Sequence, residues 1–132
     1  MRTYRATHPC GYGSVRQARR AVAAFAETCG FHDGSLSDVE SAVGEALANA
    51  AEHGDREASS GFEVSAMFDE QRLIIEVQDH GSGFDCGPAL TGAPRLLGGG
   101  SRGFGIFLMR MLMDEVVYSE RGSRIQLVKR LA

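Results

Sequence analysis

Two polar side chains one helical turn apart form the first candidate site. Glu45 and Asn49 stand four residues apart in an alanine-rich segment, so in a helix they share one flank. The amide oxygen of Asn49 is a hard neutral ligand that suits Mg²⁺, which binds few protein groups and keeps the phosphate oxygens of a substrate. The carboxylate of Glu45 can accept a proton from an attacking hydroxyl or orient a water. Two exposed helix residues are the alternative, although Asn is disfavoured in mid-helix because it competes for backbone hydrogen bonds.

A carboxylate that follows a predicted strand forms the second candidate site, in the segment Asp79-His-Gly81-Ser-Gly83-Phe84. An ionised Asp79 can only accept hydrogen bonds. It therefore suits the amino group of adenine, whereas guanine presents an oxygen there. Gly81 and Gly83 let the backbone pass close to a flat base. A simple turn after a strand is the alternative.

Glycines before the last predicted helix form the third candidate site, in the segment Gly98-Gly-Gly-Ser-Arg-Gly103-Phe-Gly105. Gly103 and Gly105 straddle the expected helix start, where free N–H groups and the helix dipole favour phosphate. The spacing matches neither a P-loop, which needs Gly-Lys-Ser/Thr, nor a dinucleotide fingerprint, which needs a strand leading into it. Arg102 either contacts a terminal phosphate or is solvated. Together the three sites indicate that the chain binds ATP.

Four more basic side chains have two interpretations each. His53 is the last residue before Gly54, where the helix dipole favours a cationic His, and a place near the nucleotide is the alternative. Arg16, Arg19 and Arg20 fall off the apolar stripe of their predicted helix. They are either solvated or a basic surface for a protein partner.

Length and composition predict one domain that spans residues 1–132 and acts in the cytoplasm. The 132 residues are 43% hydrophobic, which is enough to bury a core without disulfides. The net charge of -3 argues against nucleic acid or an anionic membrane as the main partner. No apolar run approaches the ~20 residues that span a bilayer, and the N-terminus lacks the apolar core of a signal peptide. Three dispersed cysteines indicate reduced thiols rather than a zinc site: Cys10, Cys29 and Cys86.

A helix over residues 37–53 is expected to carry the first site. A capping box at Ser37-Asp-Val-Glu40 begins it and Gly54 stops it. Its apolar residues gather on one face, which places Asn49 at the border between core and solvent.

Other periodic segments predict the elements around this helix. Residues 2–7 can form an edge strand, and a helix capped by Ser14 ends at Gly30. Strict alternation over residues 62–68 and 73–77 predicts a hairpin with one buried face.

The second half of the chain predicts a lid, a helix and a closing hairpin. Nine of the 25 residues from 81 to 105 are glycine, which is typical of a functional lid. Apolar spacing predicts a third helix over residues 104–112, and residues 115–119 and 124–129 form a second hairpin. This order predicts an α/β fold, a two-layer sandwich whose mostly antiparallel mixed sheet is covered by three helices on one face.

The three segments, in this order and spacing, resemble the N, G1 and G2 boxes of the GHKL (histidine-kinase-like) ATPase superfamily, over residues 14–129. Within it the chain is most similar to the small anti-sigma-factor serine/threonine kinases of bacterial stress-response and sporulation pathways. It has the minimal length of a bare ATPase domain, and its last helix ends in Leu112-Met-Asp-Glu-Val116, as in those kinases. The resemblance implies a Bergerat-type ATP-binding fold.

The resemblance also implies residue roles, position by position. Glu45 matches the catalytic base, Asn49 the Mg²⁺ ligand and Asp79 the residue that recognises adenine, while Gly81 and Gly83 line the base. The residues that match the phosphate contacts are Gly103, Phe104 and Gly105, and residues 86–102 match the mobile lid.

The activity implied is that of an ATP·Mg²⁺-dependent protein serine/threonine kinase that is also an anti-sigma factor. Its partners would be a sigma factor and an anti-sigma-factor antagonist that it phosphorylates, and it would pair as a homodimer with ATP or ADP bound. Three alternatives stay open. They are a nucleotide-binding module without kinase activity, a switch kinase that activates a phosphatase, and the ATP domain of a split histidine kinase.

Overall fold

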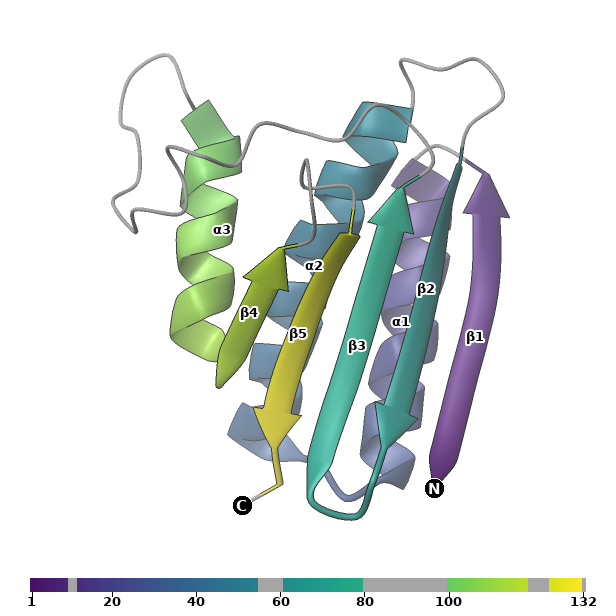
Figure 1. The fold of residues 1–132 in the computed structure, drawn as a ribbon, viewed down its shortest axis with the longest axis vertical. Coiled ribbons are helices and arrows are strands. Elements are labelled where there is room, and N and C mark those ends of the chain that lie inside the picture. The colour runs from purple at the N-terminus through teal and green to yellow at the C-terminus, as the bar shows by residue number, and fades with distance from the viewer. Residues whose placement is uncertain (10–11, 55–60, 80–99, 119–123, 132) are drawn as a thin grey trace.

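A computed structural model describes residues 1–9, 12–54, 61–79, 100–118 and 124–131. Its elements follow the predicted order of one strand, two helices, two strands, one helix and two strands (Figure 1). They are β1 (Arg2–Pro9), α1 (Tyr12–Thr28), α2 (Asp33–Gly54), β2 (Gly61–Phe68), β3 (Arg72–Asp79), α3 (Gly100–Leu112), β4 (Glu115–Tyr118) and β5 (Arg124–Arg130).

The strands form one sheet and the helices form a layer over one of its faces (Figure 1). The strand order is β1-β2-β3-β5-β4, so β3 is central and β1 is an edge strand, as expected. The sheet, expected to be mostly antiparallel, is antiparallel at every pairing of its described strands. In the helical layer α2 lies between α1 and α3 and packs against both. The predicted two-layer sandwich is confirmed.

The hydrophobic core fills the space between the two layers. On β2 and β3 every second side chain is buried, which is the pattern that strict alternation predicts for a sheet covered on one face. The apolar face predicted for residues 37–53 is also confirmed, since its central members have no exposed surface. The fully buried members on α2, β2 and β3 are Val39, Ala42, Val43, Ala46, Leu47, Phe62, Val64, Leu73 and Ile75.

The end of α1 follows the predicted glycine signal. Gly30 has φ of 106°, a conformation that glycine adopts without steric cost. The N–H of Phe31 donates to Ala26 O at 3.1 Å and that of Gly30 donates to Glu27 O at 3.1 Å. This pair of bonds is a Schellman motif, which satisfies carbonyls that the helix end leaves free and turns the chain toward α2.

Both helix starts predicted for the first half of the chain are wrong by a few residues. α1 begins at Tyr12, so Ser14 lies inside the helix rather than at its cap. α2 begins at Asp33, four residues before Ser37, because an earlier cap is available. Ser35 Oγ accepts a hydrogen bond from His32 N at 3.3 Å and donates one to His32 O at 2.9 Å.

The third helix also begins earlier than its apolar spacing predicts. α3 starts at Gly100, so Gly103 and Gly105 lie in its first two turns instead of straddling its start. The segment predicted as a lid, residues 86–102, lies outside the described residues except for its helical end. None of the described helices combines the length and the hydrophobicity needed to cross a membrane.

A carboxylate holds the tight turn between β2 and β3. Asp69 Oδ1 accepts hydrogen bonds from the backbone N–H of Arg72 at 2.8 Å and of Gln71 at 3.0 Å. The Arg72 side chain adds an ion pair to Oδ2 at 3.2 Å. The backbone N–H of Arg72, then that of Gln71, hold the pKa of Asp69 below its ordinary value of 3.8.

We therefore expect Asp69→Asn to reduce the free energy of unfolding at neutral pH. A carboxyl whose pKa is lowered by folding stabilises the fold at any pH above 3.8, its pKa in the unfolded chain. This contribution is lost as the pH falls through the lower pKa that the carboxyl has in the folded protein. Urea denaturation from pH 7 to pH 3 should show that the difference in the free energy of unfolding between wild type and variant shrinks below pH 3.8. Glu70→Gln in the same turn is the control, and a gap that stays constant with pH would contradict the assignment.

Candidate functional site

The first and third candidate segments meet where α2 packs against α3. A Cβ atom built on Gly105 would lie 2.7 Å from Glu45 Oε2 and 3.5 Å from Glu45 Cδ. Real Cβ atoms essentially never come within 3.0 Å of another heavy atom. The carboxylate of Glu45 therefore lies directly against the backbone of α3, in space that any other residue at position 105 would fill.

Asn49 lies one helical turn beyond Glu45 and is almost completely buried. Its exposed fraction is 5%, so it lies deeper than the core border that helical geometry predicted. Its Nδ2 atom has no hydrogen-bond partner among the described residues. A buried polar group left without a partner costs about 1–3 kcal/mol, so this amide fits a site that a polar ligand completes. A half-turn of the amide presents the oxygen in place of the nitrogen.

Asp79 ends the central strand β3 and is 4% exposed. It continues the buried row of Leu73, Ile75 and Val77, so it is on the face of the sheet that the helices cover. Its neighbour in the register is Phe62 of β2. A buried carboxylate at a strand end is unusual among ionisable residues and marks this position as a candidate for ligand recognition.

Three helices and strands that are far apart in the sequence each have one terminus at the same end of the molecule. The C-terminal end of α2, the C-terminal end of β3 and the N-terminal end of α3 all lie at the top of the molecule in Figure 1. They carry Asn49, Asp79 and the part of the third candidate segment that lies in α3. α2 also packs on both β3 and α3, so the helix that bears Glu45 and Asn49 is the element the other two share.

Part of the predicted site is described only as backbone or not at all. His53 lies in the last turn of α2, and Arg102, Gly103 and Phe104 lie in the first turns of α3. Gly81 and Gly83 lie outside the described residues. For these residues the assigned roles remain predictions.

The donor set fits a magnesium ion that is shared with a phosphate ligand. No group of three or more His, Cys, Asp or Glu side chains that could hold a metal occurs in the part of the chain that the structure describes. Asn49 would be one protein ligand among oxygens that come from the nucleotide and water. Mg²⁺ is usually bound in this way, through one or two protein groups and substrate phosphates.

The close approach of Gly105 to Glu45 was not foreseen from the sequence. Gly105 was interpreted only as a phosphate contact, and no local signal shows which helix a glycine faces. A second neighbour of the site, His8, was also missed. It stacks on Phe62 with ring centroids 5.3 Å apart, in the same register row as Asp79. The alternation of Tyr4, Ala6 and His8 on β1 was the signal that it faces the core.

The contact between Gly105 and Glu45 predicts non-additive effects in a double-mutant cycle. We expect Gly105→Ala to raise the free energy of unfolding less in the wild-type chain than in a chain without the Glu45 carboxylate, because the new methyl group must push the flexible end of Glu45 aside. In the Glu45→Ala background the same change should raise it by about 0.5–1 kcal/mol, since Ala has the higher helix propensity. Urea denaturation of the four proteins gives the comparison. Equal effects in both backgrounds would show that the two residues do not touch.

Comparison with known proteins agrees with this geometry. The family model described as the histidine kinase-like ATPase domain matches residues 11–129. The chain is similar to serine-protein kinase RsbW of Oceanobacillus iheyensis, with 33% identity in an alignment that covers 89% of this chain and 80% of that protein. It is 32% identical to anti-sigma F factor of Clostridium acetobutylicum, over 84% of this chain and 80% of that protein. It is 33% identical to RsbW of Bacillus subtilis, over 86% of this chain and 76% of that protein.

The matching family model defines the class of the chain, a histidine kinase-like ATPase domain. The chain belongs to the histidine-kinase-like (GHKL) ATPase superfamily and, within it, to the family of the anti-sigma-factor serine kinases.

Proposed function

We propose that this protein is an ATP-dependent protein serine/threonine kinase that acts as an anti-sigma factor in a bacterial partner-switching pathway. In one state it holds a sigma factor inactive, and in the other it phosphorylates a Ser or Thr of an anti-sigma-factor antagonist. The names of its relatives, a serine-protein kinase and an anti-sigma F factor, support both halves of this proposal. The observation that carries it is the placement of Glu45 against α3 with buried Asn49 one turn away.

In this proposal each described residue of the site has one task. Asp79 accepts a hydrogen bond from the adenine amino group and so selects ATP over GTP. Glu45, whose carboxylate lies against Gly105, accepts the proton of the attacking hydroxyl. The oxygen of Asn49 holds Mg²⁺, which offsets the charge of the transferred phosphoryl group when it is bound.

The remaining predicted residues complete the nucleotide site in the proposal. Gly81 and Gly83 line the base, residues 86–102 close over the nucleotide as a lid, and His53 lies near it. The first turns of α3, with Arg102, Gly103 and Phe104, contact the phosphates, because the first N–H groups of a helix are free to bind an anion. Gly105 is part of the same segment.

The proposal also includes the partners and the place of action. The protein acts as a homodimer and binds a sigma factor and an antagonist, whereas nucleic acid and membrane are not partners. A net charge of -3 supports the exclusion of nucleic acid and membrane, since binding to phosphate backbones or anionic lipids favours a basic protein. Sigma factors act on bacterial RNA polymerase, so the proposed place of action is the cytoplasm.

Phosphoryl transfer to the antagonist tests the proposal. The purified protein is mixed with Mg²⁺, ATP labelled in its terminal phosphate, and a candidate anti-sigma-factor antagonist from the same organism. We expect label on one Ser or Thr of the antagonist and none on a variant antagonist with Ala at that position. Bound ATP without label on the antagonist would contradict the kinase and leave a nucleotide-binding module. Label together with binding of a phosphatase in place of a sigma factor would indicate the switch kinase.

A further inference from the structure

A row of three side chains crosses the sheet from its edge to the candidate site. His8 of β1 is opposite Phe62 of β2, and Phe62 is opposite Asp79 of β3. All three belong to the more buried half of the alternation of their strands, so they point to the face that the helices cover. Phe62 has no exposed surface and Asp79 is almost completely buried. The edge strand is thus linked to Asp79 through one aromatic ring.

His8 meets Phe62 through the face of its imidazole ring. The two ring centroids are 5.3 Å apart and the ring planes differ by 22°, which is a stacked arrangement. The Nε2 atom of His8 is buried and has no hydrogen-bond partner among the described residues. A buried nitrogen without a partner costs stability. A hydrogen bond at Nε2 therefore does not explain this imidazole within the described part of the chain, whereas its stack on Phe62 is a direct contact.

Phe62 lies between this stack and the carboxylate of Asp79. Residues directly opposite each other on antiparallel strands have Cβ atoms about 4.5–5.5 Å apart, so the Phe62 ring borders the Asp79 side chain. A binding residue discriminates between ligands only when its rotamer is held by the side chains packed around it. A ring held in place beside Asp79 limits the directions that its carboxylate can take.

We infer that His8 is a positioning residue for adenine recognition. Its ring holds Phe62 in place, and Phe62 holds the direction of the Asp79 carboxylate. His8 acts through Phe62 and contacts no nucleotide itself. The inference rests on the proposed function for one point, the hydrogen bond of Asp79 with the adenine amino group.

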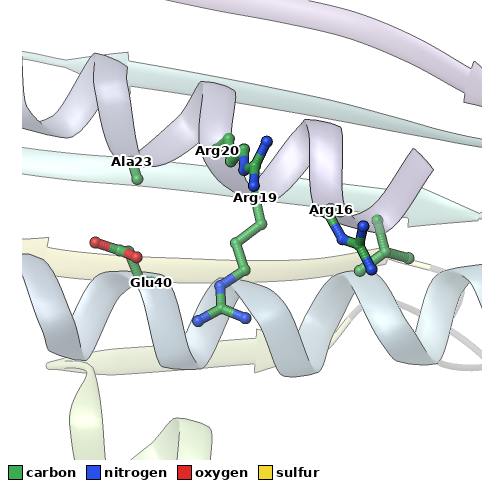
Figure 2. Close-up of a pocket in the computed structure, with 6 residues that line it drawn as sticks. Arg16, Arg19, Arg20, Ala23 and Glu40 are labelled. Atoms are coloured by element: carbon green, nitrogen blue, oxygen red, sulfur yellow. The ribbon is translucent and has the colours of Figure 1, made fainter. Parts of the chain in front are cut away.

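A second path from β1 to the site would pass through the helices. α1 packs on both β1 and α2, and a groove of about 520 Å³ lies between α1 and α2 (Figure 2). Arg19 of α1 crosses this groove in Figure 2, and Glu40 of α2 lines it. A Cβ atom on Gly44 of α2 would lie 3.4 Å from Arg19 Cδ, one residue before Glu45. The contact between Arg19 and Gly44 therefore allows the path through the helices to be tested separately.

Removal of the imidazole ring tests the inference. The full chain is titrated by calorimetry with ATP, ADP and GTP, each with Mg²⁺. His8→Ala should weaken the binding of ATP and of ADP by the same factor, about 5-fold, because both contain the base that Asp79 recognises. The preference for ATP over GTP should fall with it. The rate of phosphoryl transfer at saturating ATP should stay within about 2-fold, since Glu45 and Asn49 are unchanged.

Two further variants at the same position separate the stack from folding. His8→Phe keeps an aromatic ring against Phe62 and removes the unpaired nitrogen, so its affinity for ATP should lie within about 2-fold of wild type. His8→Leu fills much of the space without a flat ring. It should weaken ATP by at least about 3-fold even if His8→Ala does not fold. Circular dichroism and thermal melting show which variants are folded.

Tyr4→Ala is the matched control for the loss of a ring. Tyr4 is on the same face of β1, is partly buried like His8, and contacts Phe25 with ring centroids 6.3 Å apart. Its register row continues to Ala66 and Ile75 instead of Asp79. Tyr4→Ala should therefore destabilise the fold but leave the affinity for ATP within about 2-fold. Arg19→Ala tests the path through the helices and should also leave that affinity within about 2-fold.

Three outcomes would overturn the inference. They are unchanged affinity for ATP in folded His8→Ala and His8→Leu, an equal loss of affinity in Tyr4→Ala or Arg19→Ala, and a loss in His8→Phe as large as in His8→Ala. The kinase proposal is scored on the same proteins by label transfer to the antagonist. ATP binding that depends on the His8 ring, without label on the antagonist, would remove the kinase alone. Label transfer with unchanged affinity in His8→Ala would remove the role of His8 alone.

Discussion

Glu45→Gln should lower the rate of phosphoryl transfer to the antagonist by about 100-fold or more while ATP binding stays within about 2-fold. The amide keeps the shape of the carboxylate against Gly105, so the packing between α2 and α3 is preserved. It cannot accept the proton of the attacking hydroxyl, because an amide is a far weaker base than a carboxylate. Single-turnover transfer of labelled phosphate and titration with a fluorescent ATP analogue measure the two quantities separately. Glu45→Ala should abolish transfer in the same way.

Glu40→Gln is the matched control for this experiment. Glu40 is on the same helix but lines the groove that faces α1, so its loss removes the same charge at a distance from the site. It should leave the rate of transfer within about 2-fold. Retained transfer in Glu45→Gln, or an equal loss in both variants, would remove Glu45 as the base.

Asp79→Asn should weaken ATP binding by at least about 10-fold and reduce the preference for ATP over GTP. The carboxylate of Asp79 is 4% exposed, so a change in its hydrogen-bonding character cannot be compensated by water. An amide can offer a donor where adenine needs an acceptor, and a buried mismatch of this kind costs about 1–3 kcal/mol. Calorimetric titration with ATP and with GTP, each in the presence of Mg²⁺, measures both effects.

The control is Glu76→Gln on the same strand. Glu76 points to the opposite face of β3, where it accepts a hydrogen bond from Gln126 at 3.3 Å and pairs with Arg124 at 3.7 Å. It should leave the affinity for ATP unchanged. An unaltered affinity and an unaltered preference in Asp79→Asn would contradict its role in recognising adenine, provided that thermal melting shows both variants folded.

Most of the fold could be predicted because its signals are local. Alternation in β2 and β3 marks one buried face whatever the rest of the chain does, and Gly30 marks a helix end through its own backbone preference. The helix starts could not be placed as well. Ser37 has a better capping sequence than Ser35, but Ser35 closes on His32 and adds a turn. α3 begins in a glycine-rich segment with low helix propensity, so its start has no local signal in the sequence.

Part of the candidate site could be predicted from local sequence signals, and part of it depends on contacts between distant elements. The spacing of Glu45 and Asn49 places them on one flank of a helix, which the sequence alone predicts. Their position at the end of the molecule where β3 ends depends on strand order, because β3 becomes central only when β5 pairs beside it. The contacts of Gly105 with Glu45 and of Arg19 with Gly44 arise between helices, so no spacing within one helix predicts them.

A crystal structure of the protein with Mg²⁺ and a non-hydrolysable ATP analogue tests whether Asn49, Asp79 and the start of α3 form one site for ATP and its metal ion. We expect the metal about 2.1 Å from Asn49 Oδ1, the adenine amino group hydrogen-bonded to Asp79, and the phosphates at the start of α3. A nucleotide bound elsewhere, such as in the groove between α1 and α2, or a metal without Asn49 among its ligands, would contradict it.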